Sequence, residues 1–182
     1  MKTLRVGDPM KHDTDIGSLI TAEAALKVER QVAKAVSQGA KLLLGGKRMK
    51  PKGLKGHFFA PTILADVRHG SFATKEEIFG PVLALTIAKD SDEAIRMAND
   101  SAYGLGACIY TKDLETSMRA MENNKAGTFW INDPLTDNDA GPFGGMRHSG
   151  IGRELGIEGL DAFREPKHVH LDYVMEAKSY WY

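Results

Sequence analysis

Glu77 and Phe79 stand two residues apart, just before the apolar run Pro81–Ile87. Such a nearly continuous apolar run is typical of a buried strand. Because side chains alternate along an extended chain, the carboxylate and the ring project to the same side. The carboxylate can accept hydrogen bonds from both hydroxyls of a ribose, and the ring can pack on a flat heterocycle. A surface glutamate beside a core phenylalanine is the simpler interpretation of local chemistry, so both remain open.

The cysteine and two histidines give less indication of a functional site than Glu77 and Phe79 do. Cys108 is the single cysteine, which excludes an internal disulfide and suits a reducing cytosol. Its apolar, strand-like setting has no neighbouring charge to activate it, and this predicts a buried, inert thiol. His168 and His170 would share one face of a strand, but no third ligand is near them in sequence. We therefore expect solvent-facing histidines and predict no metal site.

The segment Pro142–Glu154 (PFGGMRHSGIGRE) contains four glycines, which allow the backbone to turn closely against another segment. Gly150 and Gly152 give the nearest approach to a dinucleotide-binding fingerprint. The third glycine, Gly156, comes one residue late, and the stretch follows a polar turn instead of a hydrophobic strand. A Rossmann-type pyrophosphate site is therefore not expected here.

Composition excludes several classes of protein. The chain of 182 residues is 42% hydrophobic and 26% charged, as expected for one globular domain. Basic and acidic residues number 24 each, giving zero formal net charge, and no basic stripe indicates a nucleic-acid partner. The longest apolar runs are about five residues, against about 20 for a membrane span. The N-terminus lacks the apolar core of a signal peptide. These features predict a cytoplasmic globular chain.

The positions of apolar residues predict the elements that must hold these groups. Thr21 is placed to cap a helix that carries Ala25, Val28 and Val32 inward and ends at Gly39. Further helices are expected over Ser91–Ala98, Leu114–Asn123 and Glu154–Phe163. Strands are expected over Lys41–Leu44, Phe58–Leu64, Pro81–Ile87, Leu105–Tyr110, Thr128–Asn132 and Val169–Val174, with Lys47–Gly56 as an exposed loop. The alternation of helices and strands predicts an α/β fold with an open, mainly parallel sheet flanked by helices.

Two segments, Glu76–Val82 (EEIFGPV) and Pro142–Glu154, resemble signature motifs of the aldehyde dehydrogenase family. Four further stretches match in the same order. They are Gly7–Pro9 with Asp13–Gly17, Phe59–Leu64, Ala98–Gly106 (ANDSAYGLG) and Ala126–Asn132 (AGTFWIN). The resemblance runs from Val6 to Val174, with Ser18 where the family usually has proline.

The resemblance implies roles for four residues and no catalytic residue. Glu77 would hold the nicotinamide ribose of NAD or NADP, and Phe79 would contact the nicotinamide ring. Leu105 would approach the nicotinamide, and Phe143 would line the region where the cofactor and substrate pockets meet. The nucleophilic cysteine and the general-base glutamate are expected upstream of Met1, so we expect the chain alone to be inactive.

The resemblance also implies a division of the chain and two possible functions. Residues 1–164 would be the C-terminal part of the catalytic domain, and residues 165–182 an oligomerisation strand with an aromatic tail. The chain would then be part of an enzyme that oxidises an aldehyde to a carboxylic acid through a thiohemiacetal and a thioester, acting as a homo-oligomer. The alternative is a non-catalytic interaction module derived from such an enzyme. The loop Asp133–Asp139 would influence the choice of aldehyde, or its carboxylates would face solvent.

Overall fold

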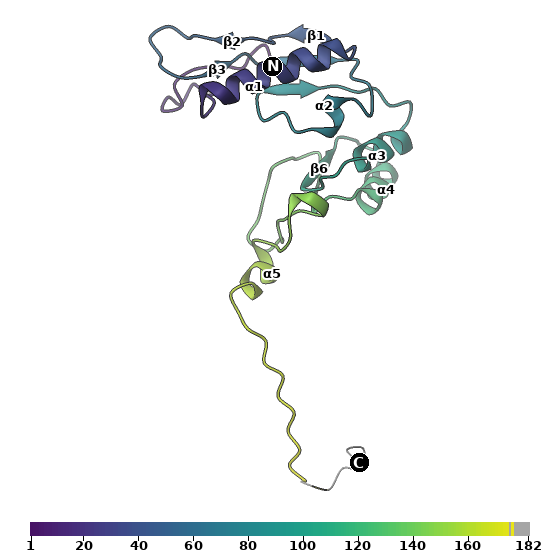
Figure 1. The fold of residues 1–182 in the computed structure, drawn as a ribbon. Coiled ribbons are helices and arrows are strands. Elements are labelled where there is room, and N and C mark those ends of the chain that lie inside the picture. The colour runs from purple at the N-terminus through teal and green to yellow at the C-terminus, as the bar shows by residue number, and fades with distance from the viewer. Residues whose placement is uncertain (175, 177–182) are drawn as a thin grey trace.

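The computed structural model describes residues 1–174 and 176, arranged as two bodies along the chain (Figure 1). We call residues 1–88 the N-terminal body and residues 91–164 the C-terminal body. An extended segment, residues 165–174, runs away from the C-terminal body (Figure 1). No helix in the described part of the chain has both the length and the apolar character that a membrane crossing requires.

The N-terminal body is a small sheet covered by one long helix. Strand β4 (Thr62–Ala65) lies between β1 (Lys41–Leu44), with which it is antiparallel, and β5 (Val82–Ala84), with which it is parallel. A second, two-stranded sheet pairs β2 (Arg48–Met49) with β3 (Phe58–Phe59). Helix α1 (Ala22–Ser37) packs on β4, and the single turn α2 (Phe72–Lys75) follows the sheet's second strand.

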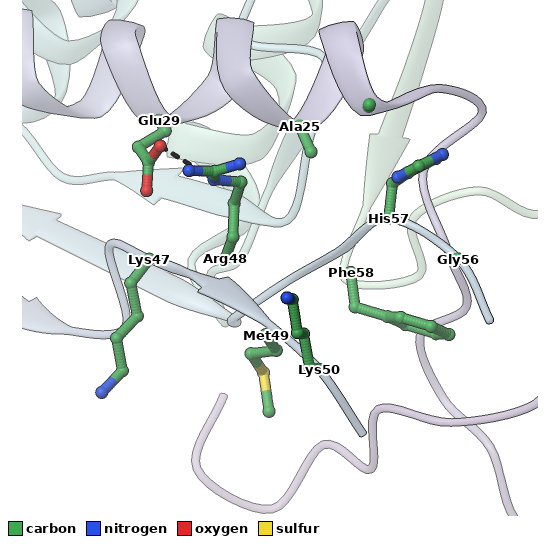
Figure 2. A pocket seen from close by; sticks show the side chains of 10 residues that line it. Ala25, Glu29, Lys47, Arg48, Met49, Lys50, Gly56, His57 and Phe58 are labelled. Carbon is green, nitrogen blue, oxygen red and sulfur yellow. Dashed lines mark ion pairs between the residues drawn. The ribbon is translucent and has the colours of Figure 1, made fainter. Parts of the chain in front are cut away.

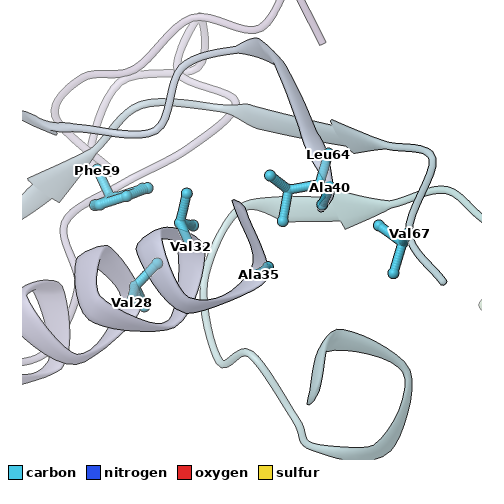
Figure 3. Packing of buried hydrophobic residues seen from close by; sticks show 7 residues of the cluster. All are labelled: Val28, Val32, Ala35, Ala40, Phe59, Leu64 and Val67. Atoms are coloured by element: carbon cyan, nitrogen blue, oxygen red, sulfur yellow. The ribbon is translucent and has the colours of Figure 1, made fainter. Parts of the chain in front are cut away.

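Helix α1 supplies one side of the hydrophobic core. The Thr21 hydroxyl accepts a hydrogen bond from the Ala24 amide at 3.0 Å and caps the first turn. The residues that face the sheet share helical spacing, and together with sheet and loop residues they form one cluster (Figure 3). Its members are Val28, Val32, Ala35, Ala40, Phe59, Leu64 and Val67. The cluster lies entirely within the N-terminal body.

Two valines of α1 allow a matched test of this core. Val32 is 3% exposed, whereas Val36, one turn later, is 40% exposed. We expect Val32→Ala to lower the free energy of unfolding by about 2 kcal/mol, because it removes buried methyl groups and leaves a cavity. Val36→Ala should cost less than about half of that, since much of its side chain is already in water. Urea unfolding followed by circular dichroism measures both, and equal losses would contradict this description of the core.

The C-terminal body also consists of strands and helices, but few of its apolar side chains are buried. Strands β6 (Gly106–Ile109) and β7 (Thr128–Ile131) are parallel, and helices α3 (Ser91–Asn99) and α4 (Leu114–Asn123) pack on each other. A 3-10 turn, η1 (Arg147–Ser149), and the short helix α5 (Gly156–Asp161) complete it. Large apolar side chains here are uncovered: Leu105, Ile131, Leu155, Ile157 and Leu160 are all exposed.

The α/β class is confirmed, but the strands divide into three sheets, and several boundaries differ from expectation. The expected strand Phe58–Leu64 is interrupted at Ala60 and Pro61, since proline has no amide hydrogen for a strand ladder. The expected loop Lys47–Gly56 begins with β2, which the sequence did not predict. The run Pro81–Ile87 is not a buried strand: the strand itself spans only Val82–Ala84, and Ile87 is 81% exposed.

Two C-terminal elements were also predicted wrongly. The helix expected over Glu154–Phe163 begins only at Gly156, because Leu155 has a left-handed φ of 59° and Glu154 pairs with Phe143. The strand expected over Val169–Val174 is extended but pairs with no strand of the described chain. A strand acquires its hydrogen bonds from a neighbour, so an alternating pattern alone cannot form one. The aromatic tail that follows includes Tyr180–Tyr182, which lie outside the described residues.

An ion pair between Arg5 and Asp15 stabilises the irregular segment before α1. Arg5 Nε lies 3.0 Å from Asp15 Oδ2, and the Arg5 amide donates to the same oxygen at 2.7 Å. These hydrogen bonds lower the pKa of the Asp15 carboxyl to about 2. Val6 and Ile16 form a bridge beside this pair, so the two ends of the loop are held together.

The lowered pKa of Asp15 gives a prediction with a definite sign. Because the folded pKa lies below the ordinary value of about 3.9, the pair stabilises the loop above that pH. The stabilisation should then be lost as the pH falls towards about 2. Carbon-13 NMR of the side-chain carboxyl should give a midpoint near that value, and Arg5→Gln should return it towards 3.9. A wild-type midpoint near 3.9 would show that the pair does not form in solution.

Candidate functional site

Glu77 and Phe79 lie on the same side of the segment, as their spacing predicted, and this side faces away from the core. Ile78, between them, packs against the core cluster, whereas Glu77 is exposed and Phe79 is 76% exposed. The alternative of a core phenylalanine is therefore wrong. The Glu77 carboxylate has no hydrogen bond or ion pair with the other described residues, so it is available to a ligand.

Contacts with α1 fix the backbone of this segment. Gln31 Nε2 donates to the Glu77 carbonyl oxygen at 3.1 Å. Gly80 lies so close to the helix that an added Cβ would be 2.7 Å from Val28 Cγ2. The glycine of the EEIFGPV motif is therefore needed for close packing on α1, and this packing holds the Glu77–Phe79 backbone in place.

Leu105 and Phe143 meet at a cavity of about 560 Å³ in the C-terminal body. The cavity is mainly apolar, and its other lining residues come from β6, β7 and the following loop, including Cys108, Trp130, Leu135 and Asp137. Trp130 Nε1 donates to the Thr136 carbonyl oxygen at 2.7 Å, which holds the loop over the strand. The volume falls within the range of small-molecule sites. Glu77 and Phe79 do not line this cavity.

The glycine-rich segment positions Phe143. The Phe143 and Glu154 backbones exchange two hydrogen bonds, each 2.7 Å long, and so close the segment into a loop. Arg153 Nη1 donates to the Gly145 carbonyl oxygen at 2.9 Å, across the inside of the loop. A Cβ on Gly144 would lie 2.7 Å from Arg153 Cδ, so only glycine fits there.

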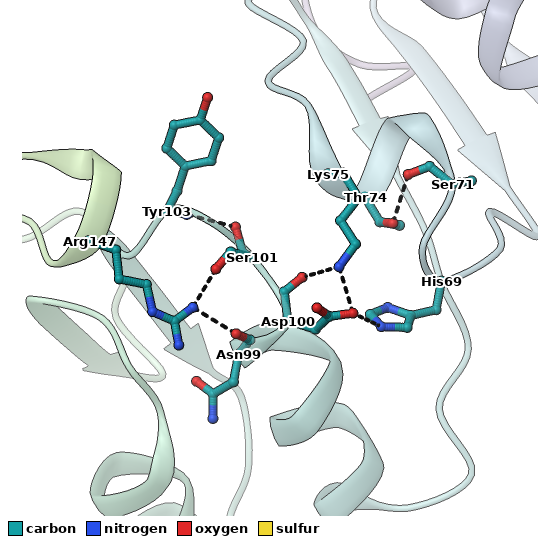
Figure 4. Close-up of polar contacts among 9 residues, drawn as sticks. All are labelled: His69, Ser71, Thr74, Lys75, Asn99, Asp100, Ser101, Tyr103 and Arg147. Atoms are coloured by element: carbon teal, nitrogen blue, oxygen red, sulfur yellow. Dashed lines mark hydrogen bonds and ion pairs between the residues drawn. The ribbon is translucent and has the colours of Figure 1, made fainter.

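The same segment is hydrogen-bonded to the turn that carries Leu105, and we call this set of hydrogen bonds the clasp. Arg147 Nη1 donates to the carbonyl oxygens of Asn99, at 2.7 Å, and of Ser101 (Figure 4). The Gly104 amide donates to Ser149 Oγ at 3.0 Å, and the Gly104 carbonyl oxygen accepts from the Met146 amide at 2.9 Å. The two motifs PFGGMRHSGIGRE and ANDSAYGLG therefore form one unit that sets Phe143 beside Leu105.

A charged cluster lies on the other side of this turn (Figure 4). Asp100 Oδ2 is 2.6 Å from Lys75 Nζ and 2.7 Å from His69 Nε2. Hydrogen bonds from Lys75 first, and then from His69, hold the pKa of the Asp100 carboxyl below its ordinary value. Sequence reasoning did not identify this cluster, because its members are 25 and 31 residues apart.

Cys108 is exposed and lines the cavity, so the prediction of a buried thiol is wrong for this chain. The reason is the same as for Leu105: one face of β6 has no covering layer. His168 and His170 are exposed, as expected, although on an unpaired segment. No group of three or more metal-ligating side chains occurs among residues 1–174 and 176.

A second cavity, also of about 560 Å³, lies between α1 and the β2–β3 pair (Figure 2). Arg48, which faces α1, forms an ion pair of 2.9 Å with Glu29, and Lys47 points away from the helix (Figure 2). The charge of Arg48 is therefore already neutralised, and none of the four predicted site residues lines this cavity. The Leu105–Phe143 cavity is the better candidate site.

Comparison with known proteins gives one consistent result. A model of the aldehyde dehydrogenase family matches residues 1–169. Betaine aldehyde dehydrogenase of Bacillus subtilis is 39% identical over 170 residues, which are 93% of this chain and 35% of that protein. A peroxisomal aminoaldehyde dehydrogenase of Malus domestica is 40% identical over 182 residues, covering 100% of this chain and 36% of that protein.

Solved structures agree with these relatives. An NAD-dependent aldehyde dehydrogenase from Sinorhizobium meliloti superposes with a TM-score of 0.91 at 38% identity, covering 98% of this chain and 35% of that one. Betaine aldehyde dehydrogenase from Staphylococcus aureus, in complex with NAD+, gives 0.90 at 37% identity over 100% of this chain and 36% of that one. This chain belongs to the aldehyde dehydrogenase family. It spans about a third of the length of the relatives it matches.

Proposed function

We propose that this chain supplies one wall of the cofactor and substrate site of an NAD-dependent aldehyde dehydrogenase. In this proposal Glu77 and Phe79 hold the nicotinamide ribose and ring, while Leu105 and Phe143 enclose the nicotinamide where it meets the aldehyde. The nucleophilic cysteine and the general base come from residues outside this chain. The chain alone is therefore inactive.

The observation that carries the proposal is the clasp between the two motifs that bear Leu105 and Phe143. It places both apolar side chains at one open cavity of ligand size. The exposed Glu77 carboxylate and Phe79 ring fit the ribose hydroxyls and the nicotinamide face. When bound, NAD+ accepts a hydride from the substrate. NAD is supported by the NAD-dependent enzyme of Sinorhizobium meliloti and by the NAD+ complex of the Staphylococcus aureus enzyme.

The uncovered apolar surface supports a larger assembly. Leu83 and Leu85, at the β5 end of the N-terminal body, and Ile131 in the C-terminal body are all at least 38% exposed. Such surface is costly in water and marks a face that packs against further protein. In this proposal the rest of the catalytic unit covers it. The cytoplasmic location remains a prediction, since some relatives are named as mitochondrial or peroxisomal.

The alternative function is a non-catalytic interaction module, and the segment after α5 supports the oligomerisation role that both functions share. Val169, Leu171 and Tyr173 alternate along it, and each is more than 70% exposed. In this second proposal the segment pairs as a strand with a sheet of a neighbouring subunit and so gives the homo-oligomer. Deletion of residues 165–182 should then lower the mass of the assembly in light scattering, and an unchanged mass would refute the oligomerisation role.

A hybrid enzyme tests the proposed function. It joins residues 1–182 to the part of Bacillus subtilis betaine aldehyde dehydrogenase that precedes the matched region. NAD+ reduction is measured with a cationic, an anionic and an uncharged aldehyde. We expect turnover by the hybrid and none by the 182-residue chain. Robust turnover by the chain alone would refute its inactivity, and a folded hybrid that binds no NAD+ would refute the proposed cofactor wall.

A further inference from the structure

The main packing between helices and strands lies within each body. Helix α1 packs on α2, β2 and β4, whereas α3 packs on α4. Residues 89 and 90 connect the bodies covalently. Beyond that connection, the ion pairs and side-chain hydrogen bonds that join described residues of the two bodies all end on Asp100.

Asp100 is engaged from the N-terminal body at two atoms (Figure 4). Its carboxylate accepts from Lys75 Nζ at 2.6 Å and from His69 Nε2 at 2.7 Å. Its backbone carbonyl oxygen accepts a further hydrogen bond from Lys75 Nζ at 2.7 Å. A lysine bonded to both the carboxylate and the carbonyl of one residue is restricted in position as well as in distance. This geometry fixes α2 against the end of α3.

The neighbours of Asp100 tie it firmly to the C-terminal body. Asn99 Nδ2 donates to the Asn123 carbonyl oxygen at 2.7 Å, and Asn99 Oδ1 accepts from the Lys125 amide at 2.7 Å. The Asn99 and Ser101 carbonyl oxygens accept from Arg147. A displacement of Asp100 would therefore move the turn and the glycine-rich segment together.

On the N-terminal side, Lys75 ends α2 one residue before Glu76 and two before Glu77. The Asp100 cluster thus lies between the segment that bears Glu77 and Phe79 and the unit that bears Leu105 and Phe143. We propose that Asp100, with Lys75 and His69, is a positioning junction that sets the spacing between these two pairs of residues. It is not a catalytic group, and it acts through the segments that it joins.

A consequence for cofactor binding rests on the proposed function above. In that proposal Glu77 and Phe79 hold the nicotinamide and its ribose from the N-terminal body, and Leu105 and Phe143 enclose the nicotinamide from the C-terminal body. A looser junction would displace the first pair of residues relative to the second. In the hybrid enzyme, Asp100→Asn should then raise KM for NAD+ about fivefold and change kcat less. The distance between the bodies and KM for NAD+ are measured independently, so the junction and the proposed function can be refuted independently.

The structural test measures a distance between the bodies in the 182-residue chain. One nitroxide is attached to the native Cys108, which is exposed on β6, and the other to Ala33→Cys on the exposed face of α1. Pulsed electron paramagnetic resonance gives the distance distribution. We expect Asp100→Asn to widen it at least about twofold, because a neutral amide cannot retain the ion pairs.

Asp92 provides a matched control. Its side chain is 58% exposed, against 56% for Asp100, but its ion pair with Arg119 lies within the C-terminal body. Asp92→Asn should leave the distance distribution unchanged. Lys75→Met, which removes the partner and leaves Asp100 in place, should reproduce the broadening, and circular dichroism must show that each variant is folded.

An unchanged distribution in folded Asp100→Asn and Lys75→Met would overturn the junction. Equal broadening in Asp92→Asn would also overturn it, since the effect would then follow from loss of any surface ion pair. Broadening with an unchanged KM for NAD+ in the hybrid enzyme would support the junction and refute the assignment of Glu77 and Phe79 to the cofactor.

Discussion

Replacing Glu77 with glutamine in the hybrid enzyme is expected to lower kcat/KM for NAD+ about 10- to 100-fold. A carboxylate accepts hydrogen bonds from both ribose hydroxyls, and each bond to a charged acceptor is stronger than one to a neutral amide. Glutamine also presents an amide nitrogen where the second hydroxyl requires an acceptor. The effect should appear mainly in KM for NAD+, because the proposed function assigns Glu77 to the cofactor and not to the aldehyde.

Glu76 is the matched control for Glu77. It is the same residue type, it is exposed, and as the preceding position of an extended segment it projects to the opposite side. Glu76→Gln should change kcat/KM by less than about twofold. Steady-state kinetics with varied NAD+ measures both variants. Similar values for the two would show that the loss of Glu77 acts through net charge, and the assignment to the ribose would fail.

The second large effect is expected from Gly127→Ala, at the start of β7. A Cβ at this position would overlap the Gly144 carbonyl oxygen, and it would also press on Gly145 Cα. Both contacts are backbone atoms of the glycine-rich segment, so no side-chain rotation can relieve them. The Gly127 amide donates to the Gly104 carbonyl oxygen at 3.0 Å, and this hydrogen bond prevents Gly127 from moving away from Gly144. The segment that bears Phe143 must therefore move.

We expect this substitution to lower the free energy of unfolding by about 3 kcal/mol. In the hybrid enzyme it should also reduce aldehyde turnover at saturating NAD+, because Phe143 would leave the cavity. Gly141→Ala is the control. A Cβ added to Gly141 would lie 3.3 Å from Asn138 Nδ2, at the end of a flexible side chain, and the φ of Gly141 is not in the left-handed region. That variant should remain within about 1 kcal/mol of wild type. Urea unfolding compares the two, and equal stability would contradict the close packing of Gly127 on Gly144.

Local chemistry in the sequence predicted the long elements well. The Thr21 cap and the apolar spacing gave the position of α1, and local sequence pattern gave those of α3 and α4, because caps and helical periodicity are properties of consecutive residues. The short strands β2 and β3 were predicted poorly, since pairing across a loop determines a two-residue strand. The expected strand Val169–Val174 failed for the same reason, since no described strand pairs with it.

The sequence by itself determined the family, through motifs in a fixed order, and strand alternation predicted that Glu77 and Phe79 share one side of the chain. Only the tertiary structure decided which residues meet. It brought Phe143 to Leu105 through the clasp of two glycine-containing segments, exposed Cys108 where a buried thiol was expected, and joined the two bodies at Asp100. These contacts link residues 25 to 48 positions apart. Such contacts depend on how the backbone closes in space, and no local spacing of residue types specifies them.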